Sequence, residues 1–193
     1  MQALTRELAF DPQGWTPDRS ARIGQLFDGL APEWHTRGGP ERLRPLQDAL
    51  RRGGVPAGGL CLEVGSGIGL QTASLLEYFD SVVSMDLSSA MLALAPRRPA
   101  VSLLRTDASR LPIAEGSVGA IAVVNMFLFP WEYGRVLTSG GTLVFVSTSG
   151  EQTPIYLPPA DVVSALEPAF GPCTAVTSGA GWGTWTVVRK GGS

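Results

Sequence analysis

Short apolar runs alternate with helical segments after the glycine-rich residues 53–59, and this alternation constrains the fold more than any other feature. Strands are expected at 60–64, 81–85, 101–105, 117–124 and 142–147. Helices are expected at about 70–79, 90–95 and 160–166, with a short turn or helix at 131–137. Two further runs, 173–177 and 184–189, flank the glycine-rich turn 178–183 and indicate a terminal hairpin. Strands joined by helices form a parallel sheet covered on both faces. The sequence therefore predicts an α/β fold with seven strands, mostly parallel.

The 193 residues fit a single domain, but residues 1–54 differ from the rest. They contain four apolar residues with the spacing of one helical face: Ile23, Leu26, Phe27 and Leu30. A second, weaker helix is expected over 43–50, where Pro45 restricts its start. These helices are too few to form a domain alone. We interpret 1–54 as an N-terminal helical cap packed on a core of residues 55–193.

Composition excludes several function classes. The net charge is −2 and Lys190 is the only lysine, so binding to nucleic acid or to anionic membranes through a basic surface is not expected. The longest apolar run, 118–131, is interrupted by Asn125 and is shorter than the ~20 residues of a membrane helix. The first ten residues show no secretory signal. Cys61 and Cys173 lie in no CxxC pair, which favours two buried thiols in a cytoplasmic protein and no metal site.

Ligands of parallel sheets bind beyond the carboxyl ends of the strands, and the first strand end carries a glycine-rich turn. Its sequence is Glu63-Val64-Gly65-Ser66-Gly67-Ile68-Gly69. Glycines there let a ligand approach backbone that a Cβ would obstruct, and the helix start is expected to present free N–H groups. Leu70 stands where the dinucleotide fingerprint has its last glycine, and no G-K-[ST] phosphate loop occurs. A plain strand–helix turn is the alternative interpretation.

The next two strands also end in acids. Asp86 follows the second strand and is positioned to accept two hydrogen bonds from vicinal ribose hydroxyls; the alternative is a residue that caps the following helix. Asp107 follows the third strand, where it could accept from an exocyclic adenine amine; the alternative is an ordinary turn aspartate. Three such features at successive strand ends are more specific than any one of them.

With these motifs the chain resembles the class I S-adenosylmethionine-dependent methyltransferases. The resemblance extends over residues 55–147 and rests on the glycine-rich turn and on three further segments: Met85-Asp86-Leu87-Ser88, Thr106-Asp107-Ala108 with Leu111-Pro112, and Arg135-Val136-Leu137 with Gly140-Gly141. The chain departs from the family at Gly119, where an acid is frequent, and at Ser139, where proline is usual. The segment 129–137 is also short for the helix expected there.

The resemblance implies a Rossmann-like sheet with the strand order 3-2-1-4-5-7-6 and S-adenosylmethionine as the cofactor. It also implies roles at the strand ends. The methionyl part would be cradled by Glu63 with the turn residues Gly65, Ser66 and Gly67. Asp86 would bind the ribose with Leu87 near the adenine, Asp107 and Ala108 would face the adenine edge, and Asn125 and Met126 would line the methyl-donor side.

The expected function is therefore methyl transfer to a small-molecule acceptor, oriented against an already activated methyl group. A base is needed only if the acceptor must lose a proton. His35 is the first candidate because it is the only histidine and titrates near neutrality; the others are Glu33, Glu132, Tyr133 and Tyr156. Two alternatives stay open, a non-catalytic protein that binds S-adenosylmethionine or S-adenosylhomocysteine and a nicotinamide-dependent oxidoreductase, which Leu70 disfavours. Nothing in the sequence indicates the oligomeric state.

Overall fold

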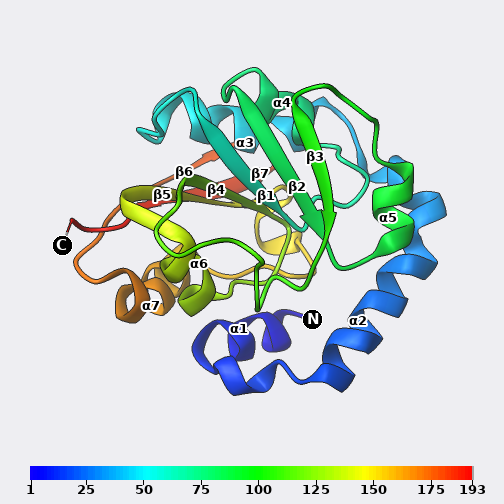
Figure 1. Cartoon of the computed structure of the whole chain (residues 1–193), viewed down its shortest axis with the longest axis horizontal. Helices are drawn as coiled ribbons and strands as arrows, with labels where there is room; N and C mark the ends of the chain where they lie inside the picture. Colours follow the sequence, from blue (N-terminus) through cyan, green and yellow to red (C-terminus); the bar gives the residue numbers. More distant parts are fainter. Residues whose placement is uncertain (193) are drawn as a thin grey trace.

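A single seven-stranded sheet organises residues 1–192, which the computed structural model describes (Figure 1). Its order is β3-β2-β1-β4-β5-β7-β6, as predicted. The first five strands are parallel, and β7 runs antiparallel to both β5 and β6. The strands are β1 (Leu60–Val64), β2 (Ser81–Asp86), β3 (Val101–Arg105), β4 (Val118–Val124), β5 (Leu137–Ser147), β6 (Thr174–Ala180) and β7 (Gly183–Arg189).

Helices cover both faces of the sheet and form two apolar clusters. On one face α3 (Pro40–Arg52) and α4 (Thr72–Leu76) pack over Cys61, Val82 and alternate residues of the neighbouring strands. On the other face α1 (Gln2–Phe10), α6 (Pro130–Val136) and α7 (Pro159–Phe170) pack over the strand residues of opposite parity. Leu62 and Val64 belong to this second cluster, while Cys61 belongs to the first, because successive strand residues point to opposite faces.

The N-terminal elements lie beyond the arrowheads of β1 to β3, so they face the carboxyl edge of the sheet (Figure 1). They are α1, η1 (Pro12–Gly14), α2 (Pro17–Leu30) and η2 (Ala31–Arg37); α5 (Ser89–Leu94) lies beside β2 and β3, and η3 (Gly150–Gln152) follows β5. The sequence did not predict α1. Thr16, not Asp18 or Ser20, caps α2 by accepting from the Arg19 N–H. Pro45 lies inside α3 instead of restricting its start.

Several further elements differ from the expected bounds. β6 extends to Ala180, into the segment 178–183 that was expected to be a turn. The helix expected over 70–79 is reduced to α4, because the glycine-rich turn extends to its start. β5 begins at Leu137 instead of 142 and includes Gly140 at φ +72°. Its pairing with β4 shifts register between Val118 and Ala120, which accommodates the glycines that the sequence analysis assigned to a turn.

Candidate active site

A cavity of about 480 Å³ lies where the carboxyl ends of the strands meet α2 and η2. Its size falls in the range of ~300–1,000 Å³ that is usual for small-molecule sites. Its lining includes every residue that the sequence analysis assigned to cofactor binding: Glu63, Gly65, Ser66, Gly67, Asp86, Leu87, Asp107, Ala108, Asn125 and Met126. The fold thus brings together residues from four strand ends, although their binding roles stay predictions.

The backbone N–H groups of the glycine-rich turn donate hydrogen bonds to the end of β2. The amides of Gly65 and Ser66 both donate to the Met85 carbonyl, at 2.8 and 2.9 Å. The Gly67 amide donates to Asp86 Oδ2 at 2.8 Å. The neighbouring strand β2 therefore already pairs these three amides, which precede the helix start where free N–H groups were expected. These three amides are therefore not available to a phosphate group.

Close contacts explain why glycine occupies this turn. Gly65 has φ +73°, and a Cβ there would lie 2.7 Å from Met126 Cγ. Gly67 has φ +55°, and its Cβ would lie 3.2 Å from the Trp34 indole nitrogen. Trp34 is stacked edge-on against Phe27 and carries the Arg37 guanidinium at 4.6 Å from its ring. The aromatic side chains of α2 and η2 therefore cover the turn.

Glu63 is a buried acid in the cavity wall, with 3% of its surface exposed. Its Oε2 accepts hydrogen bonds from Thr72 Oγ1 at 2.6 Å and from Ser84 Oγ at 2.5 Å. Burial raises the pKa of Glu63 to about 7, and the two hydroxyl donors only partly offset that rise. No pattern in the sequence identifies these two hydroxyls as partners of Glu63.

Asp86 ends β2 with one backbone hydrogen bond on each carboxylate oxygen. Oδ2 accepts from the Gly67 amide and Oδ1 from the Ser88 amide, both at 2.8 Å. Burial raises the pKa of Asp86, and backbone hydrogen bonds partly offset the effect. An ionised carboxylate has about four acceptor positions, and the Leu87 backbone also contacts Asp86, so the protein's own bonds leave at least one position for another donor.

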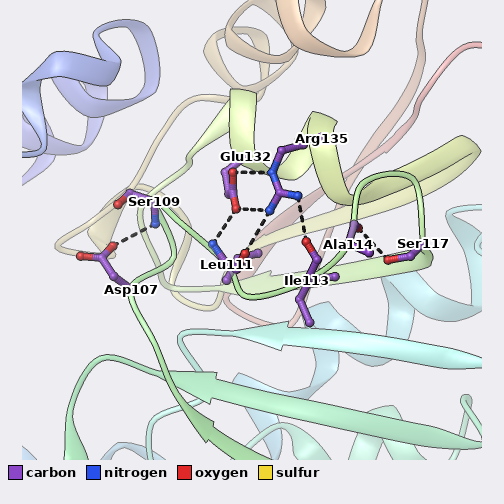
Figure 2. A network of polar contacts seen from close by, with 8 residues as sticks. All are labelled: Asp107, Ser109, Leu111, Ile113, Ala114, Ser117, Glu132 and Arg135. Atoms are coloured by element: carbon purple, nitrogen blue, oxygen red, sulfur yellow. Dashed lines mark hydrogen bonds and ion pairs between the residues drawn. The ribbon is translucent and has the colours of Figure 1, made fainter.

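Asp107 is surrounded by donors from the N-terminal helices. The Trp15 indole N–H lies 2.9 Å from both carboxylate oxygens, and Ser20 Oγ donates at 2.6 Å. The Ser109 amide donates to the same carboxylate at 2.9 Å (Figure 2). The sequence analysis did not identify Trp15 or Ser20 as site residues, because they precede Asp107 by 92 and 87 positions.

Asn125 and Met126 follow β4 in a strained turn. Asn125 is the only non-glycine residue among 1–192 with positive φ, at 50°, a conformation that asparagine tolerates better than most residues. Its side-chain amide donates to Thr148 Oγ1 at 2.8 Å, and its carbonyl accepts from the Thr148 amide at 2.9 Å. These bonds tie the end of β4 to the end of β5, and the turn directs Met126 against Gly65.

An ion pair braces the loop between β3 and β4 (Figure 2). Glu132 binds Arg135 at 2.6 Å and also accepts from the Leu111 amide at 2.5 Å. Arg135 donates to the carbonyls of Leu111 and Ile113 at 3.0 and 2.8 Å. The two charged residues of α6 thus fix the segment that follows Asp107, and Glu132 is committed to this structural contact.

The predicted bases lie outside the cavity lining. His35 is exposed on η2, with Nδ1 at 3.1 Å from the Pro32 carbonyl. Tyr133 is fully buried, and its hydroxyl donates to the Phe127 carbonyl at 3.3 Å. Glu33, Glu132 and Tyr156 are likewise not among the lining residues. A catalytic role for His35 therefore stays a prediction from sequence.

Comparison with known proteins identifies the domain. A family profile described as "Methyltransferase domain" matches residues 62–145. Among curated proteins, the demethylmenaquinone methyltransferase of Beutenbergia cavernae is 38% identical over 109 residues, which cover 52% of this chain and 44% of that protein. The chain thus spans less than half the length of this relative.

Two solved structures show the same fold. A SAM-dependent methyltransferase from Aquifex aeolicus has a TM-score of 0.67 at 16% identity, over 83% of this chain and 98% of that one. The [4+2]-cyclase SpnF has a TM-score of 0.68 at 16% identity, over 90% and 97% of the two chains. This chain therefore matches a methyltransferase domain over residues 62–145 and has the fold of S-adenosylmethionine-dependent methyltransferases.

Several features of this cavity are compatible with S-adenosylmethionine, the cofactor of the structurally similar methyltransferases. Ser66 Oγ and Gln71 Oε1, both from lining residues, are buried polar atoms without a protein partner. Such orphaned atoms are rare in proteins and are expected to bind a ligand or water. Asp86 also retains at least one acceptor position for a ribose hydroxyl, whereas Asp107 does not fit the adenine amine in the arrangement seen here.

Two further observations bear on other classes of site. Within residues 1–192, no helix combines the length and apolar character needed to span a bilayer. Over the same residues, no three His, Cys, Asp or Glu side chains are grouped so that they could hold a metal ion. Cys61 is buried and Cys173 is half-buried, and both are free thiols.

Proposed function

We propose that the protein transfers a methyl group from S-adenosylmethionine to a small lipophilic acceptor that binds beneath α2. The observation that carries this proposal is the direction of the apolar face of α2. Its four apolar residues all line the cavity, and α2 contributes no buried residue to the core: Ile23, Leu26, Phe27 and Leu30. An apolar face turned toward a cavity is stabilised when an apolar ligand fills it.

Residues in one half of the cavity would bind the cofactor, and residues in the other half would bind the acceptor. Asp86 would accept from the ribose hydroxyls, and the glycine-rich turn with Glu63 would receive the cationic methionyl end. When bound, the cofactor supplies a methyl group on a positively charged sulfur, which is an activated electrophile. Met126 and the α2 face would orient the acceptor and exclude water, and orientation of this kind supplies on the order of 7–11 kcal/mol.

The absence of a predicted base from the cavity lining supports an acceptor whose reacting atom is nucleophilic without proton removal by a side chain. The acidic residues of the lining are Glu63, Asp86 and Asp107, which belong to the proposed cofactor half. An electron-rich ring carbon in a hydroxylated aromatic compound meets this condition: it forms the C–C bond to the methyl group as the S–C bond breaks, and its ring proton then leaves to solvent. The B. cavernae relative, named for demethylmenaquinone, supports the same lipophilic class.

Asp86→Ala tests the cofactor half. We expect the Kd for S-adenosylmethionine to rise at least about 100-fold in isothermal titration, because two charge-assisted hydrogen bonds of roughly 1.5–3 kcal/mol each are lost. The control is Asp80→Ala, which removes an exposed carboxylate at the opposite end of β2 and leaves the Kd unchanged. Equal affinity of wild type and Asp86→Ala would contradict the ribose role.

The acceptor half is tested by turnover with a panel of hydroxylated aromatic compounds of increasing apolar size. We expect kcat/KM to rise with the apolar area of the acceptor, and Leu30→Ser to reduce that dependence. Tight binding of S-adenosylmethionine without turnover on any acceptor would favour the alternative of a non-catalytic binding protein. The likeness to the [4+2]-cyclase SpnF shows that this fold does not by itself determine the reaction, so turnover has to be measured directly.

A further inference from the structure

The carboxylate of Asp107 has no acceptor position left for a ligand. Its two oxygens together offer about four positions when ionised. Trp15 Nε1 occupies one on each oxygen, Ser109 N occupies a second on Oδ1, and Ser20 Oγ occupies a second on Oδ2. An additional N–H donor, such as an exocyclic amine, therefore binds Asp107 only by replacing one of these three groups.

The charge state of Asp107 favours this saturated arrangement. Burial pushes the pKa of Asp107 upward, but the hydrogen bonds from Ser20, Trp15 and Ser109 outweigh it, and the pKa lies below the ordinary 3.8. The group is ionised at neutral pH, so each contact is a charge-assisted hydrogen bond. Of the three donors, Ser109 is a backbone amide in the same turn, whereas Trp15 and Ser20 belong to the N-terminal segment around the start of α2.

The attachment of α2 to the core is polar at both ends. At its start, Ser20 and the preceding Trp15 hold Asp107. Near its end, Asp28 Oδ1 accepts from Ser88 Oγ at 2.5 Å and from the Ala90 amide at 3.1 Å. None of the 14 residues of α2 is buried, whereas α1 buries Leu8 and Ala9 in the core. Elements with few buried apolar contacts are the first to open locally.

We propose that the contact between Trp15 and Asp107 is a latch that the exocyclic amine of an adenine ring replaces, so that binding of the adenine-containing cofactor frees the start of α2. The proposal rests on the proposed function, because it requires that the cavity takes S-adenosylmethionine. The exchange balances: an amine N–H takes the acceptor positions that the indole N–H leaves. A hypoxanthine ring presents a carbonyl oxygen at that position and cannot release the latch, so the latch also discriminates between the two bases.

The latch is observed directly through the indole N–H of Trp15. In protein labelled with ¹⁵N-tryptophan, the five indole resonances are recorded with and without S-adenosylhomocysteine, and Trp15 is assigned by its loss in Trp15→Phe. We expect saturation with S-adenosylhomocysteine to increase hydrogen exchange of the Trp15 indole at least about tenfold, because its carboxylate partner is lost. S-inosylhomocysteine, which carries hypoxanthine, should leave that exchange unchanged. A Trp15 indole that stays protected in the S-adenosylhomocysteine complex overturns the proposal.

Affinity gives a second readout that does not depend on turnover. Trp15→Phe keeps a ring against Phe127 and Phe129, which lie 5.8 and 5.3 Å from the Trp15 ring, and removes only the competing donor. We expect S-adenosylhomocysteine to bind this variant about tenfold more tightly, equivalent to about 1.4 kcal/mol, with no change for S-inosylhomocysteine. The control Trp182→Phe removes an indole that is 66% exposed at the turn between β6 and β7 and changes neither Kd.

The possible outcomes distinguish failure of the latch proposal from failure of the proposed function. Weaker binding of S-adenosylhomocysteine to Trp15→Phe, or an equal gain for both nucleosides, contradicts the latch while leaving the proposed function intact. No binding of S-adenosylhomocysteine to folded wild-type protein contradicts the proposed function, and the latch with it. Circular dichroism of Trp15→Phe establishes that the variant is folded before its affinity is compared.

Discussion

Glu63→Gln should make the ligand-free protein more stable at neutral and alkaline pH. Burial raises the pKa of Glu63 from 4.5 to about 7. Below pH 4.5 the folded and unfolded chains both carry the proton, so the carboxyl group contributes no pH dependence there. Between pH 4.5 and 7 the folded chain binds more protons than the unfolded chain, so stability falls as the pH rises through this window.

The size of the effect follows from the same two values. At 1.36 kcal/mol for each pKa unit, the wild type loses about 3 kcal/mol between pH 4.5 and 7 through this one group. Gln keeps an oxygen that accepts from Thr72 and Ser84 but carries no charge. The variant should therefore match the wild type at pH 4 and exceed its free energy of unfolding by up to about 3 kcal/mol at pH 8.

Urea denaturation followed by circular dichroism from pH 4 to 8 measures this difference. Glu77→Gln is the matched control, because it neutralises an exposed carboxylate that follows α4, and its stability curve should run parallel to the wild type. If the curve of Glu63→Gln also runs parallel to the wild type, the reasoning about a buried acid is refuted. A variant that is less stable at pH 8 would show that Glu63 is instead stabilised as the anion.

Two further substitutions test the loops around the site. Gly65→Ala should lose about 1–3 kcal/mol of stability, because φ is +73° and the new Cβ meets Met126 at 2.7 Å; Gly116→Ala, at φ +56° with nothing within 4 Å, isolates the backbone part of that loss. Arg135→Leu should cost about 1–2 kcal/mol and speed hydrogen exchange of the Leu111 amide, which Glu132 then holds less firmly. Unchanged exchange at Leu111 would refute the bracing role.

The sheet and the location of the cavity could be predicted from sequence because their signals are local. Short apolar runs ending in glycine or aspartate identify strands, and parallel strands bring their carboxyl ends to one edge. The residues that follow β1, β2, β3 and β4 all reach the cavity for this reason. The bounds of α4 and β5 could not be predicted equally well, since a turn that continues to Gln71 and a register shift near Ala120 depend on neighbouring elements.

Partners of side chains far apart in the chain could not be predicted. The apolar face of α2 is visible in the sequence, but its spacing does not indicate whether the face packs on the core or on a cavity. The short polar residues Thr72 and Ser84 carry no pattern that links them to Glu63. Trp15 resembles an ordinary apolar residue of a cap until the fold places its indole nitrogen on Asp107.

Asp86 and Asp107 show most clearly what sequence position leaves undetermined. Both are aspartates at the ends of adjacent strands, and sequence alone assigns both to the same nucleoside. Asp86 accepts two short backbone hydrogen bonds, one on each oxygen, and keeps at least one acceptor position for a ligand. The acceptor positions of Asp107 are all occupied by donors from the protein itself. Since the number of free acceptor positions decides whether a carboxylate can recognise a donor, a ligand that binds both aspartates must first displace part of the N-terminal helices from the second.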